Sequence, residues 1–332
     1  MNEFTTTLLQ WYAAHRRDLP WRDVGDPYAV WLSEIILQQT RIDQGRAYWE
    51  RFMLHYPTVQ ALAAASEDEV MRLWQGLGYY SRARNLHAAA KQIAALGAFP
   101  STLEAIAALP GVGPYTAAAI ASFAFGLPVA TVDGNAYRVL ARHFGIDTPI
   151  NTTAARHEFT ALAQSLLPHD RPADFNQAMM DFGATWCTPT TPRCAECPFA
   201  ITCEARATAR VDELPVKQRK LQIKQRHMAF VFTHCRGHFA LRRRGAGDIW
   251  QGLWQPPFID DFALPLDESN LTLLAHDVKH VLTHQVITAD FYLMECDQRP
   301  PLPPEYRWIP DDDRDRYAVP RLVSRLYALL HE

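Results

Sequence analysis

Apolar residues recur every three or four positions through most of the first 200 residues, which is the spacing of an amphipathic helix. The segments ALAAASEDEVMRLW at 61–74 and NLHAAAKQIAALG at 85–97 both have it, and Gly97 is expected to end the second. These patterns predict an N-terminal part that is almost entirely α-helical.

The pattern changes after about residue 226. Short runs rich in β-branched and aromatic residues, such as HMAFVFTH at 227–234 and TADFYLMEC at 288–296, alternate with clusters of Gly, Pro and Asp. We therefore expect a β-sheet, preceded by an exposed linker that carries the basic stretch LPVKQRK. The predicted organisation is a mostly α domain over 1–203, a linker over 204–225 and a smaller α+β domain over 226–332.

Composition adds few constraints. A chain of 332 residues with 48% hydrophobic content is long enough for two domains. Its N-terminus lacks the features of a signal peptide and no apolar run reaches transmembrane length, so we expect a cytoplasmic monomer that does not enter membranes. A net charge of -3 neither requires nor excludes DNA as a partner, because the local placement of arginine matters more than the total.

The segment LPGVGPYTAAAI at 109–120 concentrates two prolines and two glycines ahead of good helix formers. Gly111 and Gly113 permit a positive φ, and Pro114 suits the first turn of a helix. Because these glycines lack Cβ atoms, backbone N–H groups stay accessible at the positive end of the helix. The segment predicts a phosphate-binding site, with a plain helix–helix turn as the alternative.

Four cysteines lie within seventeen residues in the spacing C-x6-C-x2-C-x5-C: Cys187, Cys194, Cys197 and Cys203. Without a secretory signal, such a cluster indicates a metal centre and not disulfides. Zinc and an iron-sulfur cluster both accept four thiolates, and the spacing alone does not choose between them. The isolated Cys235 and Cys296 are expected to be buried core residues.

Three features together resemble the endonuclease III superfamily of base-excision DNA glycosylases. They are the segment LPGVGPYTAAAI, an Asp nineteen residues after Pro114, and the loop with the four cysteines. Four further segments make the resemblance closer to the MutY family of adenine glycosylases: LPWR at 19–22, WLSEIILQQT at 31–40, GLGYYSRARNL at 76–86 and FNQAMMDFGA at 175–184. The resemblance covers residues 10–220. It implies a helix-hairpin-helix, a 4Fe-4S cluster on the four cysteines, and a catalytic cleft between a helical barrel module and the cluster module.

Removing a base from deoxyribose needs a proton donor at the base and negative charge near the sugar. The apolar surroundings of Glu34 are expected to raise its pKa and keep it protonated as a general acid. Asp133 begins a helix whose N–H groups and dipole favour its ionised form. A partnered buried carboxylate and a simple helix cap are the alternatives, whereas the resemblance makes Glu34 the acid and Asp133 the transition-state stabiliser.

The resemblance also assigns other residues. Strand-cutting relatives carry a lysine at the position of Tyr115, and a phenol cannot form a Schiff base, so we expect a monofunctional glycosylase that leaves an abasic site. Helix packing is the alternative for Tyr115. The resemblance places Gln39 and Tyr79 as wedges around the mispair, with Asn135 beside the substrate. The resemblance implies an adenine pocket that is lined by Trp21, Arg22 and Asp181. Arg22 and Asp181 could equally form a structural ion pair.

The C-terminal part resembles the Nudix-like module of the same family. No Arg-Glu-x-x-Glu-Glu pattern follows Phe258, so this domain is expected to bind and not to hydrolyse. The family recognises 8-oxoguanine with a Phe-Ser-His segment, which here is Leu282, Thr283 and His284. His276, His280 and His284 have helical spacing in a β-like segment, and we do not interpret them as a metal site.

The predicted function is therefore hydrolytic removal of adenine opposite 8-oxoguanine or guanine in double-stranded DNA. Two alternatives use the same helical features. One is a sibling glycosylase for a damaged or mismatched pyrimidine, which would leave the C-terminal domain without a role. The other is a DNA-binding protein without activity, which would not need Glu34 and Asp133.

Overall fold

The computed structural model describes residues 2–218, 223–263, 266, 270–282 and 285–330. The chain divides into two compact units, one made of residues 1–60 with 89–219 and the other of residues 61–88 with 220–332. Within the part of the chain that is described, no helix combines the length and the apolar character needed to cross a membrane.

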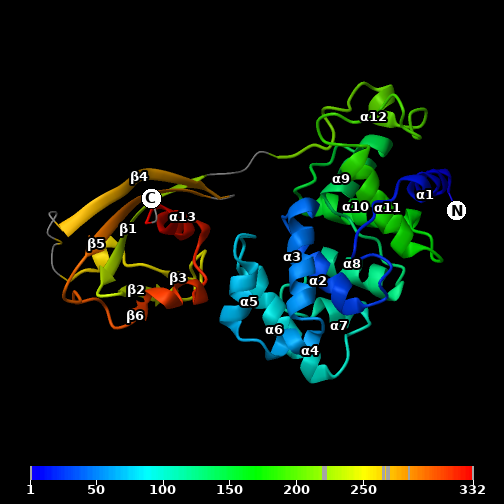
Figure 1. Cartoon of the computed structure of the whole chain (residues 1–332). Coiled ribbons are helices and arrows are strands. Elements are labelled where there is room, and N and C mark those ends of the chain that lie inside the picture. The colour runs from blue at the N-terminus through cyan, green and yellow to red at the C-terminus, as the bar shows by residue number, and fades with distance from the viewer. Residues whose placement is uncertain (1, 219–222, 264–265, 267–269, 283–284, 331–332) are drawn as a thin grey trace. The chain divides into compact units, whose positions relative to one another are not determined.

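The N-terminal two thirds of the chain are helical, as predicted (Figure 1). The helices are α1 (Glu3–His15), α2 (Pro27–Leu37), α3 (Ile42–His55), α4 (Val59–Ala64), α5 (Glu67–Trp74), α6 (Ser81–Leu96), α7 (Leu103–Ala107), α8 (Pro114–Phe125), α9 (Gly134–Phe144), α10 (Thr153–Leu166), α11 (Pro172–Thr185) and α12 (Glu204–Ala207).

The first unit is held together by two groups of helices. Helices α1, α9, α10 and α11 enclose one core that contains Leu8, Leu140 and Phe159, all without solvent exposure. Helix α2 packs on α3 and α8, and its side chains from Tyr28 to Ile36 are all buried. A helix that is apolar on every side must be enclosed by others, so any polar residue on α2 is taken out of water as well.

The helical segment 61–74 is divided in two. Ser66 caps α5 and forms a reciprocal capping box with Glu69, so the backbone leaves the helical conformation between α4 and α5. Gly97 follows the end of α6 with a φ of 77°, as expected for a glycine that terminates a helix.

The second unit contains a mixed six-stranded sheet. Its strands are β1 (Lys224–Cys235), β2 (His238–Arg243), β3 (Trp254–Gln255), β4 (Leu271–Val281), β5 (Gln285–Glu295) and β6 (Arg307–Pro310). The order is β3-β2-β1-β5-β4, with β6 paired to β2; β1 and β5 are parallel and the other pairs are antiparallel. Short 3-10 helices span Ile259–Asp261 and Asp311–Arg316.

Both faces of the middle of β1 are buried, with Val231 and Thr233 on the face opposite to Phe230 and Phe232. Helix α13 (Arg321–Leu329) packs on the face of the two phenylalanines, with the Tyr327 ring 5.7 Å from that of Phe232. Cys235 is buried as expected, whereas Cys296 is only partly buried. The helical fold followed by an α+β domain confirms the predicted fold class.

Candidate active site and cysteine loop

The glycine-rich segment forms the turn between α7 and α8. Gly111 has a φ of 76°, which a residue with a side chain adopts only under strain. The expectation of a positive φ is wrong for Gly113, which has an extended backbone (φ -85°, ψ 173°) and directly precedes α8. A Cβ there would meet no atom within 4 Å, so nothing inside the chain requires glycine at 113.

Glu34 is a carboxylic acid on the buried helix α2. The residue is only 7% exposed, and its neighbours along α2 are buried. Burial raises the pKa of Glu34 to about 7, with a further contribution from the nearby Asp133 and an opposing one from Arg22. The predicted elevation of this pKa is confirmed, and a group that titrates near neutral pH can donate a proton efficiently.

Asp133 caps the N-terminus of α9. Its Oδ1 accepts the backbone N–H of Ala136 at 2.8 Å, and its Oδ2 accepts the Asn135 amide at 2.7 Å. These hydrogen bonds favour the charged carboxylate, as predicted. Burial opposes them more strongly, so the pKa of Asp133 is raised above its ordinary value although the helix terminus favours the charged form.

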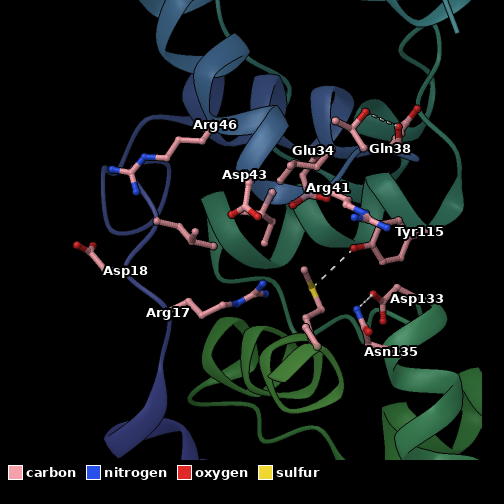
Figure 2. A pocket seen from close by; sticks show the side chains of 16 residues that line it. Arg17, Asp18, Glu34, Gln38, Arg41, Asp43, Arg46, Tyr115, Asp133 and Asn135 are labelled. Atoms are coloured by element: carbon pink, nitrogen blue, oxygen red, sulfur yellow. Dashed lines mark hydrogen bonds between the residues drawn. The ribbon is translucent and has the colours of Figure 1, made fainter. Parts of the chain in front are cut away.

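Glu34 and Asp133 line the same cavity, of about 710 Å³ (Figure 2). Asn135 and Tyr115 line it too. The remaining charged side chains of its wall are Arg17, Asp18, Arg41, Asp43 and Arg46. Three arginines at an open cavity offer contacts for phosphates despite the negative charge of the whole chain.

A second, more enclosed cavity of about 340 Å³ shares Glu34 with the first. Trp21 and Arg22 line it, together with Gln177 from α11. Glu34 therefore lies at the junction of an open cavity that contains Asp133 and an enclosed one with aromatic and polar walls. This volume and lining suit a flat heteroaromatic group.

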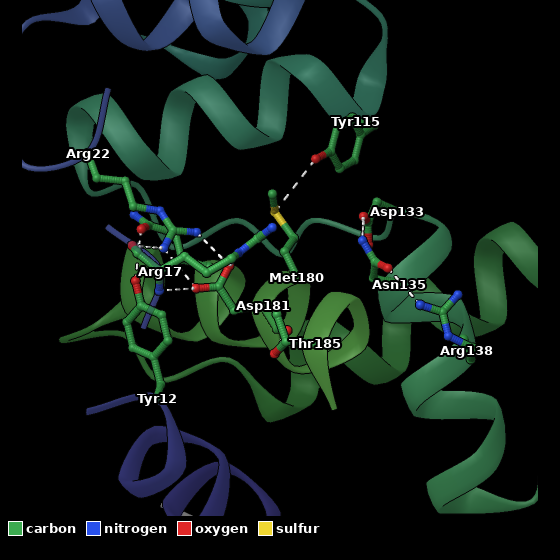
Figure 3. Close-up of polar contacts among 11 residues, drawn as sticks. Tyr12, Arg17, Arg22, Tyr115, Asp133, Asn135, Arg138, Met180, Asp181 and Thr185 are labelled. Atoms are coloured by element: carbon green, nitrogen blue, oxygen red, sulfur yellow. Dashed lines mark hydrogen bonds and ion pairs between the residues drawn. The ribbon is translucent and has the colours of Figure 1, made fainter. Parts of the chain in front are cut away.

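Asp181 is the centre of a buried ion-pair cluster (Figure 3). The Arg22 guanidinium donates to both of its carboxylate oxygens at 2.8 Å, and Arg17 donates from Nε at 2.7 Å and from its backbone N–H at 3.0 Å. These donors lower the pKa of Asp181 against the effect of burial. Asp181 has no exposed side-chain surface and lines neither cavity, so it positions Arg17 and Arg22.

Tyr115 occupies the first turn of α8 and points across the cavity towards α11 (Figure 3). Its hydroxyl contacts the Met180 Sδ at 3.7 Å. Burial, together with the carboxyls of Glu34 and Asp133, raises the pKa of Tyr115 well above its ordinary value. The side chain is therefore a neutral phenol beside the two carboxylates.

Arg138 connects this cavity with the cysteine loop. It lies one turn after Asn135 on α9 and donates to Asn135 Oδ1 at 2.7 Å and to the Gly183 carbonyl at 2.6 Å. Its Nε donates to the carbonyl of Cys187 at 2.7 Å. A single buried guanidinium therefore fixes both the partner of Asp133 and the first cysteine of the loop.

The four clustered cysteines are free thiols that come close together. Burial and the neighbouring thiols raise the pKa of Cys197 to about 11, and Arg142 donates to the Cys187 Sγ at 3.5 Å. Among the described residues, no three of these sulfur atoms lie within 4.8 Å of one another. The four thiols are possible ligands of a metal centre, and both a zinc ion and an iron-sulfur cluster accept such a set.

The remaining predicted site residues are distributed over both units. Gln39 is exposed after α2 with a φ of 57°. Tyr79 belongs to the second unit, where it is 49% exposed with a φ of 48°. Thr283 and His284 lie outside the described residues. A positive φ in two non-glycine residues is uncommon and is found more often at functional sites.

Three contributors were not predicted from the sequence. Gln177 lies in the segment 175–184 that was noted for another reason, and its Oε1 accepts the Tyr12 hydroxyl at 2.9 Å. Arg17 precedes the LPWR segment by two residues. Arg138 is three residues after Asn135 on a helix, and because side chains at this spacing are neighbours, their contact could have been predicted from the sequence.

An exposed glycine turn between two helices, next to a cavity with two buried carboxylates, defines the helix-hairpin-helix class of base-excision glycosylases. Residues 32–164 match the family described as HhH-GPD superfamily base excision DNA repair protein, and residues 228–329 match the NUDIX domain. An adenine DNA glycosylase of Buchnera aphidicola (strain Bp) is 33% identical over 293 residues, or 85% of this chain and 83% of that protein. The chain belongs to the adenine DNA glycosylase family.

Two further relatives each match a little under two thirds of this chain. The adenine DNA glycosylase of Homo sapiens is 45% identical over 222 residues, which are 64% of this chain; the chain spans 41% of that protein's length. The structure of a thermostable thymine-DNA glycosylase superposes with a TM-score of 0.58 at 32% identity. The superposition covers 62% of this chain and 95% of the thymine-DNA glycosylase chain.

Proposed function

We propose that the protein removes adenine opposite 8-oxoguanine or guanine from double-stranded DNA, as a monomer, and leaves an abasic site. The observation that carries the proposal is the position of Glu34, a carboxylic acid with a pKa of about 7 that lines both the enclosed cavity and the open one with Asp133. In this arrangement the base enters the enclosed cavity and the sugar stays near Asp133.

The mechanism follows from these two carboxyls. Protonated Glu34 donates its proton to a ring nitrogen of adenine, and the N-glycosidic bond breaks with its electron pair leaving on the base. The carboxylate of Asp133 stabilises the positive charge that develops on the sugar. Water then adds to the anomeric carbon, and its proton passes to the Glu34 carboxylate, which restores the acid.

Tyr115 supports a monofunctional reaction. The phenol lies beside both carboxyls, where an amine would have to stand to attack the sugar, and it cannot form a Schiff base. We assign to Tyr115 a place against the sugar or its phosphate, with water as the final nucleophile. Asn135 keeps the Asp133 carboxylate oriented through its 2.7 Å hydrogen bond.

Binding to DNA is proposed to use the helical part, residues 1–203. The exposed N–H groups around Gly111 and Gly113 bind a phosphate at the start of α8. Gln39 and Tyr79, each exposed on its own unit, are both proposed to contact the DNA at the mispair, because an amide can pair with base edges and an aromatic ring recovers stacking. Trp21, Arg22 and Gln177 contact adenine, and Asp181 holds Arg22 in place.

Residues 226–332 are proposed to recognise the base opposite adenine. The match to the NUDIX domain supports a nucleotide-binding surface, and the missing glutamate-rich pattern argues against hydrolysis. Thr283 and His284 are the proposed contacts to 8-oxoguanine. The prediction of an exposed linker over 204–225 is wrong for much of this segment, because Ala205 and Leu214 are buried in the helical core and β1 begins at Lys224.

We further propose a 4Fe-4S cluster bound by Cys187, Cys194, Cys197 and Cys203. Four free thiols grouped on one loop, together with the match to the glycosylase family, support it. The irons of the cluster would compensate the negative charge of the four thiolates, and the cluster would stabilise the conformation of the loop 187–203. Purified protein with a brown colour, an absorption band near 400 nm and about four irons per chain is expected. Stoichiometric zinc in a colourless protein would contradict the assignment.

The function is tested by single-turnover cleavage of a labelled duplex with adenine opposite 8-oxoguanine, with and without alkali. We expect strand breaks only after alkali, and none with Glu34→Gln or Asp133→Asn. Glu158→Gln, an exposed carboxyl on α10, is the matched control and is expected to keep full activity.

A duplex with thymine opposite guanine is the competing substrate. Release of thymine without release of adenine would assign the protein to the pyrimidine class. Breaks without alkali in the unmodified protein would contradict the monofunctional mechanism while leaving the base specificity intact.

A further inference from the structure

A second set of metal-ligating side chains lies in the sheet of the C-terminal segment, apart from the cavities and the cysteine loop. His227 on β1, Asp277 on β4 and Asp290 on β5 each offer one ligand atom, and these three atoms all lie within 4.8 Å of one another. The three strands are neighbours in the sheet, in the order β1-β5-β4 (Figure 1). None of these residues contributes to the proposed glycosylase chemistry.

Strand register brings the three side chains together. Asp290 pairs with Ala229 in the parallel β1–β5 ladder, so His227 stands two residues along β1 on the same face. On β4 the register shifts between Ala275 and Val278. Asp277 lies in this bulge and donates its backbone N–H to Asp290 Oδ1 at 2.9 Å, which directs β4 towards the carboxylate.

The distances match those between ligands of one small ion. The His227 Nε2 is 3.0 Å from Asp290 Oδ2. His276 is 2.7 Å from Asp290 Oδ1 through Nδ1, and 3.2 Å from Asp277 Oδ2 through Nε2. Two ligands at about 2.0–2.2 Å from a tetrahedral ion lie roughly 3.3–3.6 Å apart, so small side-chain rotations close the site.

The chemistry of the donors selects the ion. One imidazole and two carboxylates suit a divalent transition metal, whereas imidazole is a poor ligand for Mg²⁺. Asp290 has only 9% of its side chain exposed, while His227 has 55%, so the site has a buried anchor and an open side for solvent ligands. His276 bonds both carboxylates, as an orienting partner in a metal site does.

We propose that His227, Asp277 and Asp290 bind a divalent transition-metal ion of the Zn²⁺ class, with His276 orienting the two carboxylates. The ion ties β1 to β4 across β5. Because it needs residues from three strands, its affinity depends on the folded C-terminal segment.

Titration of the full chain with Zn²⁺ tests the proposal. The protein is first treated with a mild chelator, and its iron and zinc contents are measured so that metal on the cysteine loop is counted separately. Calorimetry is then expected to show one further equivalent of Zn²⁺, with the absorption of the protein unchanged. His227→Ala and Asp290→Asn are each expected to weaken this binding at least tenfold.

His234→Ala is the matched control. His234 also lies on β1 between two carboxylates, but Glu295 is on its Nδ1 side and Asp311 on its Nε2 side, so one ion cannot take both. This variant is expected to bind Zn²⁺ as the unmodified chain does. Absence of the additional equivalent, or equal binding by the His227→Ala and unmodified chains, would overturn the proposal and leave the cluster as a network of ion pairs. The circular dichroism spectrum of the exposed-site variant His227→Ala checks that its fold is retained.

Discussion

At the scale of single residues, Glu34 combines a functional advantage with a cost in stability. Its carboxyl has been taken out of water on a helix that is buried on every side. Burial disfavours the charged form, and this is why the pKa rises to about 7 from an ordinary 4.5. The same effect that makes Glu34 a competent acid makes the folded chain less stable whenever the carboxyl is ionised.

The pH dependence of catalysis follows from this pKa. The single-turnover rate is expected to be nearly constant below pH 7 and to fall about tenfold per pH unit above it, because only protonated Glu34 can donate. Rapid-quench measurements between pH 5.5 and 9 check this, with the DNA kept saturated. A rate that rises with pH over the same range would contradict the role of acid.

Glu34→Gln is expected to make the folded chain more stable while abolishing activity. A carboxyl whose pKa is higher in the folded than in the unfolded chain binds more protons when folded, so stability falls as pH rises from about 4.5 to about 7. At pH 7 and above the neutral amide removes this cost, for a gain of up to about 3 kcal/mol in the free energy of unfolding. Urea unfolding at pH 5 and pH 8 measures it, and the gain should be smaller at pH 5.

Tyr115→Lys tests which group faces the sugar. We expect this variant to form a covalent complex with abasic DNA that borohydride traps, and to cut the strand without alkali, because an amine can attack the anomeric carbon. The control Tyr115→Phe should form no such complex. If Tyr115→Lys still removes the base but forms no covalent complex that borohydride traps, the side chain at position 115 does not reach the sugar.

At the scale of elements, several groups of the candidate site occupy helix N-termini, whereas Glu34 lies within α2. Asp133 caps α9, Tyr115 lies in the first turn of α8, and the glycine turn exposes the N–H groups that precede α8. Helix N-termini leave N–H groups without partners inside the helix and carry a partial positive charge. Such termini suit both a phosphate and a carboxylate that must be held in position.

The two turn glycines are expected to behave differently when replaced by alanine. Gly111→Ala forces a positive φ on a side chain and should lower the free energy of unfolding by roughly 1–2 kcal/mol. Gly113→Ala should leave stability unchanged and weaken DNA binding, because its Cβ meets no protein atom and would stand where the phosphate approaches. Thermal melts and fluorescence anisotropy with a labelled duplex separate the two effects. If Gly113→Ala and the unmodified chain bind DNA with equal affinity, the proposed phosphate site at the start of α8 is wrong.

At the scale of the whole molecule, Arg138 joins the cysteine loop to Asp133, the carboxylate that we propose faces the sugar. It donates to Asn135, which donates to Asp133, and to the carbonyl of Cys187. The order of the loop is thereby connected to the position of Asp133 through three hydrogen bonds. This gives the cysteine loop a physical route to activity without direct contact with DNA.

Arg138→Met is expected to lower base removal by more than tenfold and to reduce the iron content per chain. The substitution leaves buried carbonyls without donors, at a cost of about 2–4 kcal/mol. Single-turnover rates and iron analysis of the same preparation measure both effects, with Arg156→Met on the exposed side of α10 as the control. Full activity and full iron content in Arg138→Met would show that neither base removal nor cluster binding depends on the hydrogen bonds of Arg138.

Much of the architecture could be predicted from local pattern. Helical periodicity, the glycine that ends α6 and the alternating strands β1 and β5 depend on neighbours in the sequence, so they were predicted from it. The break between α4 and α5 was missed because the capping box of Ser66 and Glu69 lies inside an otherwise regular helical run. The extended backbone at Gly113 was missed because glycine allows more conformations than one turn uses.

The sequence by itself determined the class of the protein and the chemistry available to it: a helical hairpin, four grouped thiols, and two carboxyls in contrasting local settings. Tertiary structure decided how these groups act. It joined two cavities at Glu34, made Asp181 a positioning residue, raised the pKa of Asp133 against its helix cap, and placed Arg138 between the loop and the cavity. The reason is physical: a motif is local, whereas burial and charge–charge distances depend on segments that meet only after folding.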